Sequence, residues 1–143
     1  MQLPTASFPN LTQANHTDIS PQDPRYNCHA WALGFTDRWF DDGQWWPDGV
    51  QRGETVRDYK RAYESLGFRV SSGWQVEEGF EKIAIYEYGR KVTHTARLLP
   101  DGLWASKIGQ LEDIHHTREA LDGPQYGHIT LIMRRPVITN LRS

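Results

Sequence analysis

The second half of the chain is dense in segments that have the composition of β-strands, and no other feature limits the possible folds as strongly. Four stretches rich in β-branched and aromatic residues follow one another, and Gly, Pro and Asp punctuate them. The sequence LLPDGLW predicts a hairpin turn at Pro100–Gly102. The expected strands lie within residues 82–89, 91–102, 103–109 and 127–138, with a shorter one within 68–74.

Helical patterns precede these strands. Apolar residues at helical spacing predict an amphipathic helix over residues 54–66, which Gly67 ends. Another helix is expected to begin at Cys28, with Asn27 as its N-cap, and to continue toward Phe40. Helices followed by an antiparallel sheet indicate an α+β domain rather than alternating strands and helices.

The length of the chain, 143 residues, is about that of one domain. Residues 1–24 contain four Pro among Asn, Thr, Gln and Ser. Their apolar residues do not recur with the period of two that is typical of a strand or the period of 3.6 that is typical of a helix. We therefore expect an irregular N-terminal arm over residues 1–24 and a single domain over residues 25–143.

Composition and charge exclude several classes of partner. The formal net charge is -2, and the 16 Lys and Arg are scattered, so no nucleic-acid partner is expected. No apolar run approaches the ~20 residues of a membrane span, and the N-terminus has no signal-peptide pattern. The expectation is a protein without a membrane partner, either cytoplasmic or exported without a classical signal peptide. The single Cys fits a reducing compartment and leaves one free thiol.

That thiol, Cys28, is the first candidate for chemistry. A Cys in the first turn of a helix lies beside unpaired backbone N–H groups, which lower the thiol pKa and favour a reactive thiolate. The same N–H groups can stabilise an oxyanion. The structural alternative is an inert thiol that packs as a small apolar side chain.

A thiolate nucleophile needs a base, and histidine suits that role at neutral pH. His16 lies in the expected arm, and His29 is adjacent to the thiol on a helix, where neighbouring side chains diverge. His115 and His116 lie in a polar segment, which predicts solvated side chains. His94 and His128 remain, because both come near the start of an expected strand.

A third polar group would orient the imidazole. Ser106 lies on the expected strand after His94, and the acidic pair Glu112 and Asp113 follows it. Gln22 precedes the thiol by six residues and offers an amide N–H for an oxyanion hole. The residues alone do not choose among these groups.

The sequence YNCHAWA, at residues 26–32, resembles the nucleophile helix of papain-like cysteine hydrolases, especially the bacterial NlpC/P60 and CHAP-type peptidoglycan hydrolases. Residues 81–109 resemble the strands of that group, and residues 25–136 resemble an uncharacterised bacterial domain family of the same architecture. The resemblance implies an α+β, papain-like fold in which N-terminal helices that carry the Cys pack on an antiparallel sheet.

The resemblance also implies roles for particular residues. Cys28 matches the nucleophile and His94 the base, with His128 as the runner-up base. Ser106 falls near the position of the third residue, where Glu112 also stays a candidate, and Gln22 matches the oxyanion glutamine. The expected groove walls are Tyr26, Trp45 and Trp46.

The expected function is therefore a thiol hydrolase that acts on an amide or ester bond, such as a peptidase or amidase on peptidoglycan-type peptides, with no cofactor and no metal. One alternative is an inactive binding or immunity module, whose contact surface is the Trp-rich loop at residues 43–53 and whose partner is a protein. Another is a deamidase or transamidase effector domain. A zinc site made from Cys28 with His94, His115 or His116 is weaker, because no paired ligand spacing is present.

Overall fold

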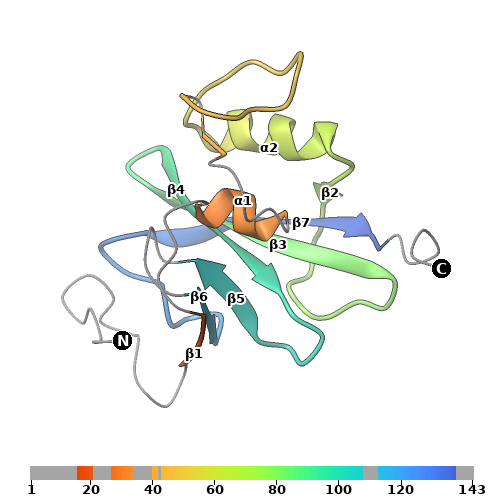
Figure 1. The fold of residues 1–143 in the computed structure, drawn as a ribbon, viewed down its shortest axis with the longest axis vertical. Helices are drawn as coiled ribbons and strands as arrows, with labels where there is room; N and C mark the ends of the chain where they lie inside the picture. Colours follow the sequence, from red (N-terminus) through yellow and green to blue (C-terminus); the bar gives the residue numbers. More distant parts are fainter. Residues whose placement is uncertain (1–15, 21–26, 34–39, 42, 108–112, 138–143) are drawn as a thin grey trace.

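A single antiparallel sheet dominates the protein (Figure 1). The structure is a computed structural model that describes residues 16–20, 27–33, 40–41, 43–107 and 113–137. Seven strands lie in the order β1-β6-β5-β4-β3-β7-β2. Their bounds are β1 (His16–Ser20), β2 (Arg69–Val70), β3 (Phe80–Tyr88), β4 (Lys91–Leu98), β5 (Trp104–Lys107), β6 (Asp113–His116) and β7 (His128–Pro136). The helices are α1 (Cys28–Ala32) and α2 (Val56–Ser65).

The expected α+β, papain-like fold is wrong. In the described part of the chain the two helices have only 5 and 10 residues, so the fold is β-rich. The helix that begins at Cys28 ends at Ala32 and does not extend to Phe40. Phe40 instead makes an isolated bridge with Trp45 and packs its ring in the core from a loop. Its apolar side chain therefore reflects burial rather than helical periodicity.

Helix α2 forms where the pattern predicts it, because its first turn is capped from both sides. The Oγ1 of Thr55 accepts a hydrogen bond from the backbone N–H of Asp58 at 3.2 Å, and the Asp58 carboxylate accepts one from the Thr55 N–H at 3.1 Å. The helix ends just before Gly67, which adopts a φ of +100° that favours glycine. Its buried face carries Tyr59, Ala62 and Tyr63.

The expected strands are present as β2, β3, β4, β5 and β7, and the turn at Pro100–Gly102 closes through the Leu99 N–H and the Leu103 carbonyl at 2.8 Å. The N-terminal segment differs from the expectation. Residues 16–20, placed in an irregular arm, form the edge strand β1, which pairs with β6. An edge strand needs a partner on one side only, so the free edge of β6 organises this segment without a strong side-chain pattern of its own.

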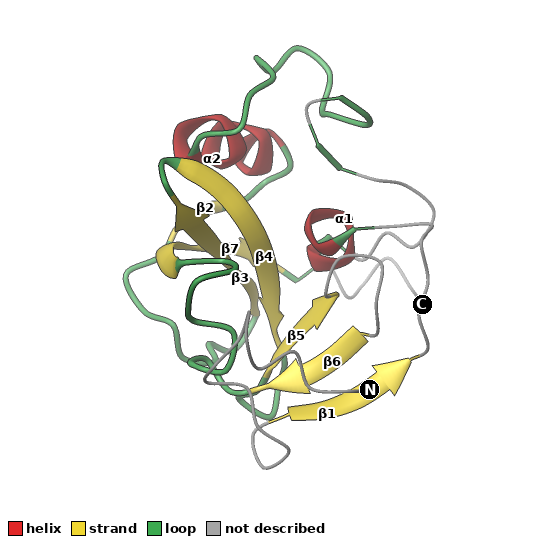
Figure 2. Ribbon diagram, turned by 90° about the vertical axis from the view of Figure 1, so that its left-hand side faces the viewer, coloured by secondary structure: helices red, strands yellow, loops and turns green. Residues whose placement is uncertain are grey.

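Both faces of the sheet are covered. On β3, Ile83 and Ile85 belong to the core beneath the helices, whereas Ala84 and Tyr86 belong to a core on the opposite face. The sheet bends beyond β4, so that β5, β6 and β1 run below α1 (Figure 2). Helix α1 contacts both β4 and β5. This arrangement places Cys28 at the start of a helix that lies on the concave side of the sheet.

Candidate functional site

Asn27 fixes the start of α1. Its Oδ1 accepts a hydrogen bond from the backbone N–H of Ala30 at 3.1 Å, as expected for an N-cap, and another from the N–H of Phe40 at 3.0 Å. Its Nδ2 donates to the Phe40 carbonyl at 2.9 Å. One buried amide therefore caps the helix and holds the segment at Phe40 against it. The predicted N-cap is confirmed.

Helix α1 is also attached to β4 through side chains. The Nδ1 of His29 lies 2.7 Å from the Oγ1 of Thr95, and the Tyr63 hydroxyl donates to the same oxygen at 3.2 Å. Burial lowers the pKa of His29 to about 3. His29 is therefore a neutral structural group that joins the helix to the sheet.

The Cys28 thiol is buried but borders an open groove. The backbone N–H groups of Thr95, His29 and Cys28 lie near its Sγ and favour the thiolate. The groove has a volume of about 480 Å³. Its walls come from α1, α2, the start of β4 and the loop before β7, and they include Asp41, Glu54, Tyr59, Lys91, Thr93, Gln125 and Tyr126.

The expected lowering of the thiol pKa is wrong. Burial raises the pKa of Cys28 to about 11, although the three backbone N–H groups and the charge of Lys107 act in the opposite direction. Loss of hydration disfavours the thiolate more than these groups favour it. The resting sulfur is therefore a neutral thiol.

His94 is fully buried between two tyrosines. Its side chain lies on the face of β4 opposite to that of Thr95. Its ring stacks on Tyr126 at 4.2 Å between centroids and meets the Tyr86 ring edge to face at 5.2 Å. Burial holds its pKa well below the ordinary value, so the imidazole is neutral. Its Nδ1 has no hydrogen-bond partner among the described residues.

The other nitrogen of His94 meets Ser106. The Nε2 of His94 lies 2.8 Å from the Ser106 Oγ, which in turn lies 2.6 Å from the Nε2 of His116. The Nδ1 of His116 lies 2.7 Å from the carbonyl oxygen of Thr117. The structure thus brings together His94 and Ser106, which the sequence singles out, and adds His116.

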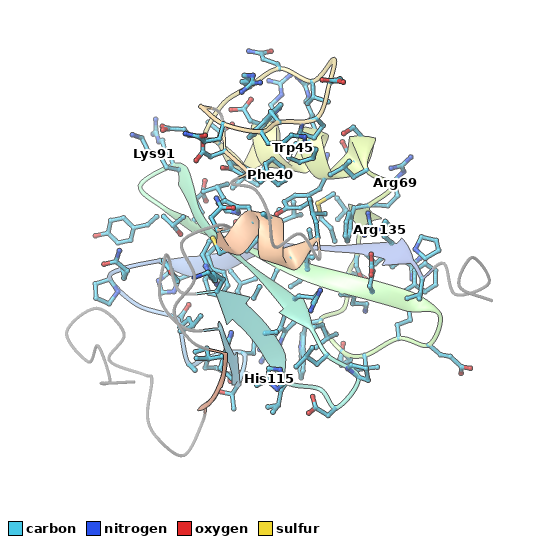
Figure 3. All side chains as sticks on the ribbon, viewed as in Figure 1. Phe40, Trp45, Arg69, Lys91, His115 and Arg135 are labelled. Carbon is cyan, nitrogen blue, oxygen red and sulfur yellow. The ribbon has the colours of Figure 1, made fainter. Side chains whose placement is uncertain are left out.

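The burial of His116 was not predicted from the sequence. Two adjacent histidines in a polar stretch suggested solvated side chains, but His116 is fully buried and His115 is half-buried. The alternation of side chains on β6 could have indicated this burial. Ile114 and His116 lie two residues apart, so they share one face of the strand, and both point inward. His115 marks the position of β6 in Figure 3.

His128, the runner-up base, does not lie at this site. Its side chain is exposed, and its Nδ1 pairs with the Asp122 carboxylate at 2.8 Å. It borders a different groove, together with Trp74 and Arg118. The structure therefore separates His128 from the groove beside Cys28.

The Trp-rich loop does not line the groove either. Trp46 is buried in the core against Phe40 and Tyr59, with ring centroids 5.2 and 5.1 Å away. Trp45 is half-buried, with its ring edge to face with Phe40 at 5.2 Å, and Figure 3 shows these two residues beside α2. Both indoles serve the fold because the loop turns back onto the core, so the expected groove walls at Trp45 and Trp46 are wrong.

The remaining predicted residues lie outside the described part of the structure. They are Gln22, Tyr26 and Glu112, together with the side chain of Asp113. Among the described residues, no three His, Cys, Asp or Glu side chains gather into a group that could hold a metal ion.

A family model for a domain of unknown function, DUF7689, matches residues 17–134. The chain belongs to this family. The matched range contains Cys28, His94, Ser106 and His116, so the whole described site lies in the DUF7689 domain. Comparison with curated proteins and with solved structures finds no match. None of the helices in the described residues has the length and apolar character of a transmembrane span.

Proposed function

We propose that the protein is a thiol hydrolase that cleaves an amide or ester bond, with Cys28 as the nucleophile and His94 as the base. The observation that carries the proposal is the position of the thiol. The Sγ of Cys28 lies against the backbone N–H of Thr95, which belongs to the peptide bond that joins His94 to Thr95. The only thiol of the chain is thus at the wall of a groove and beside the strand that carries His94, whose buried Nδ1 has no hydrogen-bond partner among the described residues.

The raised pKa of Cys28 and the lowered pKa of His94 define how the proton would move. In the resting protein both groups are neutral, so a preformed thiolate–imidazolium pair is not part of the mechanism. The reaction requires the Sγ of Cys28 and the Nδ1 of His94 to come within hydrogen-bond distance, a contact that the described residues do not make at rest. The thiol proton then passes to this nitrogen as sulfur attacks the substrate carbonyl, and the imidazolium protonates the leaving group. Water hydrolyses the resulting thioester, with His94 again accepting a proton.

Backbone donors would stabilise the charge that develops on the attacked carbonyl. The N–H groups of Cys28 and His29 lie near the sulfur, and a tetrahedral intermediate would place its oxyanion within the same region. These donors require no particular side chain. We therefore expect the activity to depend on the position of α1 rather than on the polarity of a side chain near the thiol.

Peptide-like amides, including those of peptidoglycan peptides, are the substrate class we propose to screen first. The groove combines the aromatic walls of Tyr59 and Tyr126 with the polar side chains of Asp41 and Gln125, a mixture that suits an extended peptide. Deamidation and transamidation begin with the same thiol attack, so both belong to the screen.

A generic activated ester tests the nucleophile before the substrate is known. Wild type and three variants, Cys28→Ala, His94→Gln and His128→Gln, are mixed with p-nitrophenyl acetate, and product release and intact mass are followed. We expect an acetyl adduct on the wild type that turns over, no adduct on Cys28→Ala, and a loss of about 100-fold or more in His94→Gln. The exposed His128→Gln is the matched control and keeps the wild-type rate. Turnover by a folded Cys28→Ala protein would exclude Cys28 as the nucleophile.

One observation favours a second candidate, a domain that binds a protein partner without catalysis. A thiol with a pKa of about 11 behaves as a small apolar side chain in the resting fold. The exposed apolar residues Val70, Trp74 and Val76 lie close together in the chain and would form its contact surface. A folded wild-type protein that forms no acyl adduct with activated esters would favour this candidate over the hydrolase.

A further inference from the structure

We infer that His116 is a positioning residue that fixes the tautomer of His94, so that the Nδ1 of His94 carries a lone pair and no proton. This inference deepens the proposed function and takes its catalytic meaning from it, but the tautomer is a property of the resting protein. Three side chains on three neighbouring strands carry the argument: His94 on β4, Ser106 on β5 and His116 on β6.

All three side chains are fully buried, so water cannot satisfy their polar atoms. They form one continuous chain with contacts of 2.8 Å from His94 to Ser106 and 2.6 Å from Ser106 to His116. Its far end is the backbone carbonyl of Thr117, 2.7 Å from the Nδ1 of His116. A chain of this kind has one direction of donation at a time, because each hydroxyl carries a single proton.

The carbonyl of Thr117 sets that direction, since a carbonyl oxygen only accepts hydrogen bonds. The Nδ1 of His116 must therefore carry the proton that it donates to Thr117. Full burial disfavours a charged imidazole, so the other nitrogen of His116 has a lone pair and its Nε2 accepts from Ser106.

The same reasoning continues through Ser106. Its hydroxyl proton is donated to His116, so its oxygen is free to accept from the Nε2–H of His94. Neutral His94 then holds its proton on Nε2 and a lone pair on Nδ1, the nitrogen without a partner among the described residues. The reverse direction would set a lone pair of His116 against the lone pairs of the Thr117 carbonyl, at a cost in a buried site.

The consequence for the proposed reaction concerns the base. An imidazole accepts a thiol proton only through an unprotonated nitrogen, and the wrong tautomer removes that ability even where the ring stays in place. His116 is not among the residues that line the groove, and it acts through Ser106. Its contribution is therefore to keep one nitrogen of His94 ready to accept a proton.

The test is nitrogen NMR of the full chain with ¹⁵N-labelled histidine, at neutral pH. The His94 signals are assigned by their loss in His94→Gln. In the wild type we expect an unprotonated Nδ1 and a protonated Nε2. His116→Phe keeps a similar volume but frees the Ser106 hydroxyl to donate to His94, so a population with protonated Nδ1 should appear. His116→Gln can accept from Ser106 through its side-chain oxygen and should restore the wild-type tautomer.

His115→Phe is the matched control on the same strand, and it should leave the His94 signals unchanged. Ser106→Ala removes the link with little change in volume and decides the question if His116→Phe does not fold. A protonated Nδ1 in the wild type, or an unchanged tautomer in both folded His116→Phe and Ser106→Ala, would overturn the inference.

Ester turnover separates this inference from the proposed function. If both hold, His116→Phe loses about 100-fold in turnover and His116→Gln recovers most of it. If the wild type shows the expected tautomer but no acyl adduct, the proposed function fails and the tautomer assignment stands. If turnover needs Cys28 and His94 but ignores the tautomer change, the positioning role of His116 is excluded.

Discussion

The Nδ1 of His29 lies 2.7 Å from the Oγ1 of Thr95, and this contact joins the first turn of α1 to the middle of β4. The residue before His29 is the thiol, and the residue before Thr95 is His94. One buried hydrogen bond therefore sets the distance between the two elements that carry the proposed nucleophile and base.

Replacing Thr95 with Val tests this attachment. The two side chains have nearly the same shape, but Val leaves the buried His29 ring and the Tyr63 hydroxyl without their shared oxygen. A buried polar group that loses its partner costs about 1–3 kcal/mol, so we expect Thr95→Val to lower the free energy of unfolding by about 2 kcal/mol or more. Urea unfolding measures it. An unchanged midpoint would show that the hydrogen bond does not stabilise α1 on the sheet.

Acid should destabilise the protein before the carboxylates titrate. Burial lowers the pKa of His29 to about 3 and holds that of His94 well below its ordinary value, whereas both groups titrate near 6.5 in the unfolded chain. The unfolded state therefore binds more protons as the pH falls below 6.5, and stability present above that pH is lost toward pH 3. Each histidine contributes a slope of about 1.4 kcal/mol per pH unit within that window.

Urea unfolding between pH 7.5 and pH 4.5 measures this slope. His29→Gln removes one of the two groups and should reduce the pH dependence by about half. A free energy of unfolding that stays constant between pH 7 and pH 5 would contradict the neutral, buried state of these histidines.

Alkylation of Cys28 should be slow and should rise steadily with pH. Because the thiol pKa is about 11, the thiolate fraction grows about tenfold per unit up to pH 9 and beyond, without a plateau near neutral pH. Iodoacetamide labelling followed by mass spectrometry gives the rates. The urea-unfolded protein is the reference, and its rate should level off near the ordinary thiol pKa of about 8.5. A plateau below pH 8 in the folded protein would instead indicate a stabilised thiolate.

Two tryptophans should respond very differently to truncation. Trp46 is 3% exposed and Trp74 is 41% exposed. We expect Trp46→Ala to cost about 3–5 kcal/mol of stability, because it empties a site between Phe40 and Tyr59. Trp74→Ala loses mainly its stacking with Arg118 and should cost about 1 kcal/mol or less. Similar unfolding midpoints for both variants would contradict the place of Trp46 in the core.

Local signals in the sequence were enough for the elements whose stability is largely local. Helix α2 shows both an apolar stripe and a capping box, and the hairpin between β4 and β5 has its turn residues in order. Strand β1 was missed because its partner β6 lies near the other end of the chain, and pairing along an edge leaves little trace in side-chain alternation. The α+β expectation gave too much weight to helical spacing beyond Ala32, where Phe40 is buried from a loop.

The candidate site was predictable to the extent that chemistry selects residue types. Cys28 is the only thiol, and the contact of His94 with Ser106 follows from their places on adjacent strands. The thiol pKa was not predictable, because the competition between backbone donors and lost hydration depends on burial that only the fold sets. The burial of His116 also depends on the fold. The sequence predicted a solvated side chain, but β6 lies between β5 and β1, and His116 is buried there.

The order of the strands also constrains when the protein can fold during its synthesis. Strand β3 lies between β4 and β7, and β7 is the last strand of the described chain. A ribosome that has reached the middle of the chain has produced β3 and β4 as a hairpin, but the other edge of β3 stays open until residues 128–136 emerge. Pairings of this sequence separation form slowly. The sheet is therefore completed only after β7 has left the ribosome, and until then the open edge of β3 is exposed to other chains.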